Sequence, residues 1–176
     1  MFGKDIEFET IQFTKQVKDL AKDFNCGNEV LNEYLQKTAC DDTQAVTFVI
    51  RDTKNNNIMC YYSISCSGFI VELAQKQYMI YPAVEIKMFA IDEKYQHIPI
   101  SEDSDEGNLS DILFASVICR INEFTENQCG ADKIILYSVE QAKTFYERNG
   151  FKCFEDYMLQ STSRFLDGCI PMYYSL

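Results

Sequence analysis

The strongest constraint on the fold comes from residues 83–151, where strand-like and helix-like patterns alternate. Residues 83–91 form an apolar run with the alternation typical of a β-strand, and a second short strand is expected over 133–137. A helix is predicted to begin near Ser110, and another follows the second strand and stops at residues 149–150. This order predicts an α/β protein with helices packed on the faces of a sheet.

The rest of the chain contains shorter elements and nothing that divides it. The expected elements are a strand over 5–12, helices capped by Thr14 and Asn28, a hairpin of 44–51 and 58–65 around the turn residues 55–57, a strand over 152–159 and a final strand over 170–176. No repeat, low-complexity tract or linker interrupts the 176 residues, so a single domain spanning 1–176 is expected.

The composition is that of a folded globule. Apolar residues make up 47% of the chain and include 13 Phe and 11 Tyr, which is enough for a substantial core. No stretch approaches the ~20 apolar residues that span a bilayer. Residues 1–5 lack the form of a secretory signal, so we expect a cytoplasmic protein without membrane contact.

Cysteine usage and net charge exclude two classes of function. The chain has eight cysteines and one histidine, His97, but no C-x-x-C pair, so no metal site is expected and the cysteines are interpreted as small hydrophobes kept reduced. The formal charge of −11 makes nucleic acid an unlikely partner, because nucleic-acid binding needs a clustered basic face. The same charge would attract cationic partners.

Two segments carry a family resemblance. Residues 142–151 match the pattern A-x-x-F-Y-E-x-x-G-F and resemble the signature of the GNAT superfamily of acyl-CoA N-acyltransferases. Residues 85–92, followed by Tyr95 and Gln96, are similar to the family's central strand and the start of its CoA loop. The resemblance implies a mixed, mostly antiparallel sheet of six to seven strands with helices on both faces, and acetyl-CoA as co-substrate.

A weaker likeness lies nearer the N-terminus. Residues 24–28 and 31–35 resemble the opening of the toxin-type branch of the same superfamily. This likeness adds a toxin that acetylates aminoacyl-tRNA to the functions to be weighed, although the acidic balance of the chain argues against tRNA as a partner.

The resemblance assigns two catalytic roles. Tyr146 matches the tyrosine that donates a proton to the CoA thiolate, and a phenol with an ordinary pKa near 10 is protonated at neutral pH. The alternative is a helix tyrosine that only packs its ring on the sheet. Glu85 lies where some relatives place a general base. The alternative is a solvent-facing carboxylate that is paired with nothing and shares its strand face with Lys87.

The resemblance also implies a cofactor site. Backbone groups of a strand segment would line a gap between the two central strands, where pantetheine binds, and three polar residues would lie near the cofactor. The strand segment comprises Met88, Phe89, Ala90 and Ile91, and the polar residues are Gln96, Ser110 and Ser138. Ser110 is also expected to cap its helix, and Ser138 fits a capping box with Gln141.

The sequence departs from the family pattern after Gln96. Relatives read Q/R-x-x-G-x-G/A there, a glycine-rich turn that cradles the CoA pyrophosphate at a helix N-terminus. In this chain the paired glycines are missing, about ten residues are inserted, and no Lys or Arg occurs between Tyr95 and Cys119. The segment instead carries the acidic residues Glu102, Asp103, Asp105, Glu106 and Asp111. Their charges oppose pyrophosphate binding unless the loop swings into solvent, where salt screens them.

Three functions follow from these observations. The first is an N-acyltransferase that moves an acetyl group from acetyl-CoA directly to a primary amine on a cationic small molecule or protein, with Tyr146 as general acid and Glu85 as base. The second is a GNAT-fold protein that has lost CoA binding and acts as a regulatory partner. The third is the aminoacyl-tRNA acetyltransferase. The chain is expected to be a monomer or a homodimer.

Overall fold

The computed structural model describes residues 6–101 and 107–176, except for the side chains of Gln75 and Phe165. The strands are β1 Phe8–Gln12, β2 Val46–Asp52, β3 Ile58–Leu73, β4 Gln77–Ile91, β5 Lys133–Ser138, β6 Lys152–Cys153, β7 Met158–Leu159 and β8 Ile170–Ser175. The helices are α1 Glu29–Glu33, α2 Leu109–Phe124 and α3 Lys143–Arg148. Short 3₁₀ or π-helical turns are η2 Lys18–Asp23, η3 Tyr34–Thr38, η4 Ala74–Lys76, η5 Glu93–Tyr95, η7 Thr125–Cys129, η8 Glu140–Ala142 and η9 Arg164–Leu166.

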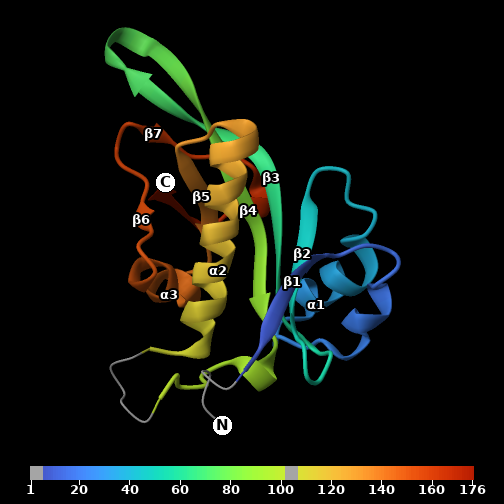
Figure 1. Ribbon diagram of the computed structural model, residues 1–176. Coiled ribbons are helices and arrows are strands. Elements are labelled where there is room, and N and C mark those ends of the chain that lie inside the picture. The colour runs from blue at the N-terminus through green and yellow to red at the C-terminus, as the bar shows by residue number, and fades with distance from the viewer. Residues whose placement is uncertain (1–5, 102–106) are drawn as a thin grey trace. The chain divides into compact units, whose positions relative to one another are not determined.

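The described strands form a mixed sheet of eight strands in the order β1-β2-β3-β4-β5-β8-β6, with β7 paired to β3 (Figure 1). The β4–β5 pair is parallel, and the other pairs with a described register are antiparallel. The mixed, mostly antiparallel sheet is therefore confirmed, but the expected count of six to seven strands was wrong. The predicted strand over 152–159 is two short strands, because the chain turns between them and β6 pairs with β8 while β7 pairs with β3.

The chain divides into two compact units. Unit 1 comprises Met1–Ile64 and Met88–Val117, and unit 2 comprises Ser65–Lys87 and Ile118–Leu176. Strands β3 and β4 and helix α2 each contribute residues to both units. The expectation of a single domain stays a prediction.

Unit 1 has helical elements on both faces of its strands. Tyr61 of β3 lies opposite Val49 of β2 and is buried with it, and its ring meets Phe24 edge-on at 5.4 Å between centroids. The Tyr61 hydroxyl donates a 2.8 Å hydrogen bond to the carbonyl of Leu31 in α1. On the opposite face, Phe89 of β4 contacts Phe114 of α2 at 4.8 Å. Helices on both faces, as predicted, are confirmed for this unit.

Of the local signals predicted in unit 1, the Asn28 cap and the turn around Asn56 are confirmed and the Thr14 cap is not. The Asn28 side chain accepts hydrogen bonds from the amides of Val30 and Leu31, as a cap should. Asn56 adopts φ 56° in the turn between β2 and β3, which is the left-handed geometry expected there. The helix predicted from Thr14 was wrong. Residues 15–17 form a turn, and the following 3₁₀ helix η2 has no side-chain cap.

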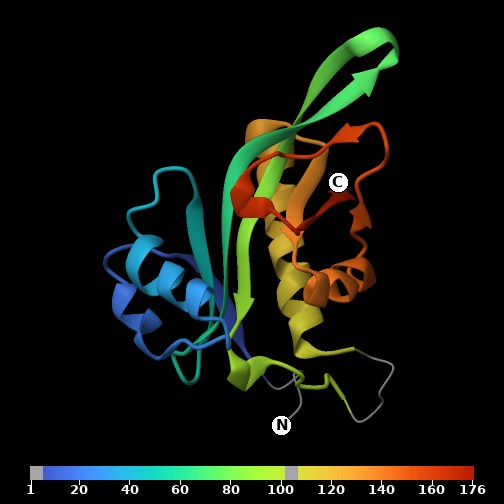
Figure 2. The same cartoon turned by 180° about the vertical axis from the view of Figure 1, so that it is seen from behind.

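Unit 2 is built on β5, which pairs in parallel with β4 over Ala83–Ile86 and antiparallel with β8. Its buried apolar cluster comprises Phe69, Val71, Ala83, Ile135, Met158 and Tyr173. The ammonium of Lys133 lies over two of these aromatic rings, 5.7 Å from Phe69 and 5.8 Å from Tyr173. Figures 1 and 2 show the β3–β4 hairpin extending beyond β7, the short strand that pairs with its outer half.

Asp52 holds the turn between β2 and β3. Burial alone would raise the pKa of this carboxyl, but the hydrogen bonds that it accepts outweigh burial and hold its pKa below the ordinary value. The donors are the Asn55 side chain (2.7 Å), the amides of Lys54 (2.8 Å) and Asn55 (3.2 Å), and the Tyr95 hydroxyl (3.3 Å). The lowered pKa stabilises the fold at neutral pH. That contribution is lost as pH falls below about 4, where the unfolded carboxyl becomes protonated.

We predict that Asp52→Asn lowers the free energy of unfolding by about 1–3 kcal/mol at pH 7, because several donors lose their charged acceptor. Urea denaturation at pH 7 and at pH 3 measures the effect, and the deficit should shrink at the lower pH. Asp19→Asn, at a surface pair in which the Asp19 side chain is 87% exposed, serves as the control and should change little. An equal deficit at both pH values would contradict the assignment to the carboxylate.

Candidate functional site

Tyr146 is packed into unit 2 by the chain that follows it. Its ring lies 5.3 Å from Phe145 and 5.9 Å from Phe151. Gly150 takes φ 88°, and the Phe151 amide then bonds back to the Tyr146 carbonyl at 3.0 Å, which ends α3 as expected. Burial raises the pKa of the Tyr146 phenol above its ordinary value, so the group keeps its proton through the whole neutral range.

Glu85 is half-buried on β4, and its partner is Ser67 of β3. The Ser67 hydroxyl donates a 2.9 Å hydrogen bond to Glu85 Oε2. Burial raises the pKa of the nearby Tyr137 phenol, and the charge of Glu85 raises it further. The Tyr137 hydroxyl accepts a hydrogen bond from the Ser161 amide at 3.4 Å. The alternative of a carboxylate paired with nothing is therefore wrong. Sequence reasoning missed Ser67, because its partner lies 18 positions away.

Glu85 and Tyr146 lie on opposite faces of the sheet of unit 2. In the strand register Glu85 is opposite Ile135, which is opposite Tyr173. The ring of Tyr146 instead belongs to a cluster with Phe151, which contacts the neighbouring residue Tyr174 at 5.5 Å. Because successive residues of a strand point to opposite faces, the carboxylate and the phenol approach the sheet from opposite sides.

Ser138, at the end of β5, does not cap the following helix. Its hydroxyl is buried and donates to the carbonyl of Val139 at 2.8 Å. The 3₁₀ turn Glu140–Ala142 comes between β5 and α3, and no side chain caps either segment. The capping box predicted for Ser138 and Gln141 was wrong, because this turn intervenes before the helix.

The predicted cofactor strand continues β4 past the end of its pairing with β5. The register stops at Ile86 opposite Leu136, whereas β4 runs on to Ile91. In unit 1 the side chains of Met88 and Ala90 pack into a buried cluster, and Phe89 contacts α2. These side chains thus pack inside the protein, so a cofactor would contact the backbone of this segment.

The Gln96 side chain holds the chain after β4 in place. Its amide nitrogen donates to the carbonyl of Ile91 at 2.7 Å and to that of Cys26 at 3.3 Å. A second contact joins the same two segments, because Glu93 accepts a 2.9 Å bond from the Asn25 side chain. The structure therefore gives Gln96 a structural role, and its predicted contact with a cofactor stays a prediction.

The inserted loop is closed at its base. Pro99 and Asn108 form an isolated antiparallel bridge, and the amide of Leu109 donates to the carbonyl of Ile98 at 2.8 Å. His97, just before the bridge, takes φ 56° without being a glycine. Helix α2 begins directly at this closure, at Leu109. The acidic residues at 102–106 lie outside the described residues.

Helix α2 starts one residue before Ser110, so Ser110 is not its cap and that prediction was wrong. Asp111, in the first turn of the helix, bonds back to the residue before it. Its carboxylate accepts the amide of Asn108 at 3.0 Å, and its own amide donates to the Asn108 carbonyl at 2.9 Å. The carboxylate bond is one half of a capping box, and it places one negative charge in the first turn.

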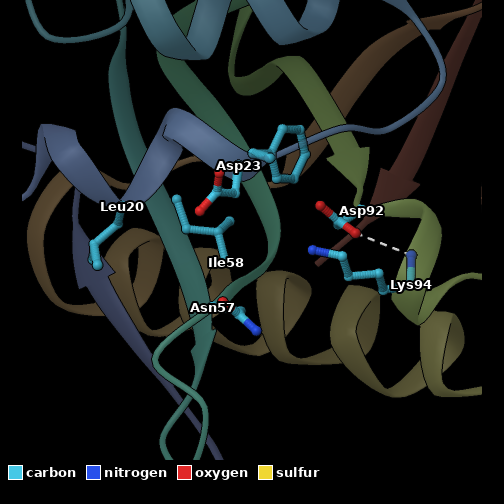
Figure 3. A pocket seen from close by; sticks show the side chains of 7 residues that line it. Leu20, Asp23, Asn57, Ile58, Asp92 and Lys94 are labelled. Carbon is cyan, nitrogen blue, oxygen red and sulfur yellow. Dashed lines mark hydrogen bonds between the residues drawn. The ribbon is translucent and has the colours of Figure 1, made fainter.

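A small hollow in unit 1 is lined by Leu20, Asp23, Phe24, Asn57, Ile58, Asp92 and Lys94 (Figure 3). Asp92 is already engaged there, because its carboxylate accepts the amides of Lys94 and Asn25, each at 3.0 Å. The described lining includes none of the predicted site residues, so the hollow is not assigned to the site. Among the described residues, no three His, Cys, Asp or Glu side chains gather as a metal site would need, and no helix is long and apolar enough to cross a membrane.

We predict that Gln96→Ala lowers the free energy of unfolding by about 1–2 kcal/mol, because two carbonyls lose their donor. Chemical denaturation measures the loss, and Lys94→Ala, an exposed change two residues away, is the control. Unchanged stability in Gln96→Ala would contradict the structural role.

No protein-family model matches the sequence, and no curated protein matches it. Solved structures do match. AtaTR bound with acetyl-CoA is 20% identical with a TM-score of 0.70, covering 97% of this chain and 94% of that chain. A tyrosine-to-phenylalanine mutant of KacT is 20% identical with a TM-score of 0.69, covering 96% and 95%.

A third match is AtaT complexed with acetyl-methionyl-tRNAfMet, which is 19% identical with a TM-score of 0.66 and covers 94% of each chain. Identities this low establish a shared fold and nothing finer. KacT and AtaT are toxin acetyltransferases with the GNAT fold. This chain has the same GNAT fold over almost its entire length.

Proposed function

We propose that the chain is an N-acetyltransferase that takes an acetyl group from acetyl-CoA and transfers it directly to a primary amine. The observation that carries the proposal is Tyr146, a phenol that burial keeps protonated on the helix that follows β5 in unit 2. Glu85 is a half-buried carboxylate on the other face of the same sheet, so its part in the reaction requires that the amine reach the thioester from that face. Direct transfer needs a proton donor for the leaving thiolate and an acceptor for the proton that the amine loses.

Each residue has one step in this scheme. Glu85 takes a proton from the amine whose nitrogen forms the new C–N bond. Tyr146 gives its proton to the thiolate sulfur as the C–S bond breaks. The products are an amide and a free thiol, and exchange with solvent returns a proton to Tyr146 and removes one from Glu85. Burial keeps the proton on Tyr146 at working pH, as a donor requires, and it also makes the phenol a weaker acid.

The residues around the loop fit acetyl-CoA better than the sequence suggested. The bridge between Pro99 and Asn108 brings the two ends of the insertion together, and the Leu109 amide donates a hydrogen bond to the Ile98 carbonyl. The N-terminus of α2 therefore follows the loop after β4 almost as it would without the insertion, and its dipole favours an anion. The backbone of Met88–Ile91, residues 96–98 and the first turn of α2 would hold the co-substrate. Acetyl-CoA supplies the activated thioester.

A toxin that acetylates aminoacyl-tRNA is the second candidate. Structures with this fold favour it, since AtaT has been solved in complex with acetyl-methionyl-tRNAfMet, and a tyrosine-to-phenylalanine mutant of AtaT with the C-terminus of the antitoxin AtaR. The likeness of residues 24–28 and 31–35 to the toxin-type branch also favours it. The net charge of −11 opposes it. Acetylation assays with charged tRNA and with free amines, each at two salt concentrations, separate the two candidates.

We predict that Tyr146→Phe lowers kcat by roughly 10²–10³-fold, because the thiolate loses its proton donor while the ring keeps its packing. Release of free CoA thiol during acetylation of a polyamine measures kcat. Tyr174→Phe, in the same aromatic cluster, is the matched control and should keep wild-type activity. Equal kcat in wild type and Tyr146→Phe would remove Tyr146 from the mechanism.

Glu85→Gln should lower kcat/KM by about 10²–10³-fold near pH 7 and regain part of that loss as pH rises towards 9. Without a base only the neutral amine reacts, and its fraction rises about tenfold per pH unit below the amine pKa near 10. Glu72→Gln, an exposed carboxylate on β3, is the control. A loss of the same size at every pH would show that Glu85 supports the fold and takes no proton.

A further inference from the structure

Ser67 and Glu85 form a hydrogen bond that joins two neighbouring strands within unit 2. Ser67 belongs to β3 and Glu85 to β4, and the serine hydroxyl donates to Oε2 of the carboxylate at 2.9 Å. Both side chains are half-buried. A hydrogen bond to an ionised group is about twice as strong as one between neutral groups, so this contact favours one orientation of the carboxylate.

The strand that carries Ser67 is held firmly against β4. A β-carbon at Gly68 would lie 2.8 Å from the Tyr81 carbonyl oxygen, so the two backbones approach closely there. The next residue, Phe69, is buried and stacks on the Tyr81 ring with 5.4 Å between the ring centroids. Because these contacts directly follow Ser67, and a serine side chain is short, the hydroxyl is a fixed anchor for a longer side chain on β4.

Glu85 needs such an anchor because its side chain is long. Several rotatable bonds separate its carboxylate from the backbone, and an unheld glutamate occupies several rotamers. Lys87, two positions further along β4, has an ammonium that would attract a carboxylate released from Ser67. A general base has to lie within about 3 Å of the atom whose proton it takes, and a displacement of about 1 Å can cost roughly 10²-fold in rate.

A second hydroxyl lies near Glu85 but has a different partner. Tyr137 of β5 is close enough to be affected by the charge of Glu85. The Tyr137 hydroxyl accepts the amide of Ser161 at 3.4 Å, whereas the hydroxyl that donates to the Glu85 carboxylate is that of Ser67. Because the bond from Ser67 is made to Oε2, Oε1 is the oxygen from which the carboxylate would take a proton.

We propose that Ser67 is a positioning residue for the acetyl transfer, and that its hydroxyl fixes Oε2 of Glu85 so that Oε1 takes the proton of the amine. In this role Ser67 contacts neither the amine nor the thioester, and no proton passes through its hydroxyl. The inference rests on the base role proposed above for Glu85. It adds a residue of β3 to a site whose proton-transfer groups come from β4 and α3.

Steady-state acetylation by the full chain tests the proposal, with spermidine or a charged tRNA as acceptor, whichever wild type acetylates. Ser67→Ala should lower kcat by roughly 10–100-fold and change KM for the acceptor by less than about threefold, because positioning acts on the reacting geometry more than on binding. Ser67→Thr keeps the hydroxyl on a residue that suits a strand, and it should recover most of the lost kcat. Ser175→Ala removes a serine hydroxyl from β8 of the same unit and should keep wild-type kcat.

A double-mutant cycle separates positioning from a purely structural role. In the Glu85→Gln background, Ser67→Ala should change kcat/KM by less than about twofold, because the base on which Ser67 acts is already absent. Equal losses in both backgrounds would show that Ser67 only supports the fold, and would overturn the proposal. So would unchanged kcat in Ser67→Ala, or a Ser67→Thr variant as slow as Ser67→Ala. Circular dichroism checks that each variant is folded.

The same cycle distinguishes failure of this inference from failure of the proposed function. A lowered kcat/KM in Glu85→Gln together with wild-type kcat in Ser67→Ala would overturn the positioning role alone. Wild-type kcat/KM in Glu85→Gln would remove the base, and the positioning role with it. A wild type that acetylates neither acceptor would overturn both.

Discussion

The parallel pairing of β4 with β5 is the contact on which the proposed site depends. It covers four residue pairs, from Ala83 opposite Lys133 to Ile86 opposite Leu136. Because β4 has 15 residues and β5 has six, β4 continues past the pairing at both of its ends. The later segment, Met88–Ile91, provides the backbone that we assign to the co-substrate.

The same pairing also fixes the face on which Glu85, one of the two proposed catalytic groups, lies. Glu85 is inside the paired segment, so its orientation follows from the register with β5, and Ser67 adds a hydrogen bond from the other neighbouring strand. Tyr146 is held separately, by the turn at Gly150 that brings Phe151 back against its ring. A paired strand and a helix that ends in this turn thus each hold one of the two groups to which we assign proton transfer. Such supports suit catalysis, because small displacements of reacting groups reduce rates strongly.

Local signals in the sequence predicted much of this fold. The alternation over 83–91, the Asn28 cap and the helix end at Gly150 are each decided by neighbouring residues, and each was confirmed. Errors arose where distant parts of the chain compete. The start of β4 at Gln77 was missed because the apolar alternation was taken to begin at Ala83, whereas the strand includes the six residues before it.

The site was harder to predict than the fold for the same reason. The resemblance identified Glu85 and Tyr146, but the Ser67 partner and the closure between Pro99 and Asn108 depend on contacts far apart in sequence. The closure has the larger consequence, because the loss of paired glycines in the sequence argued against CoA binding. A backbone bridge can close a loop whatever its side chains are, so the sequence pattern contained no signal for it.

Isothermal titration with acetyl-CoA shows whether the protein binds its proposed co-substrate, since the proposed activity requires that α2 still accepts a pyrophosphate. Titrations at low and at physiological salt also report on the acidic loop. We expect saturable binding at submillimolar acetyl-CoA, and salt should raise the affinity if the acidic residues lie close to the pyrophosphate. Absence of binding at millimolar acetyl-CoA in both salts would contradict it and would favour a GNAT-fold protein that acts through partners.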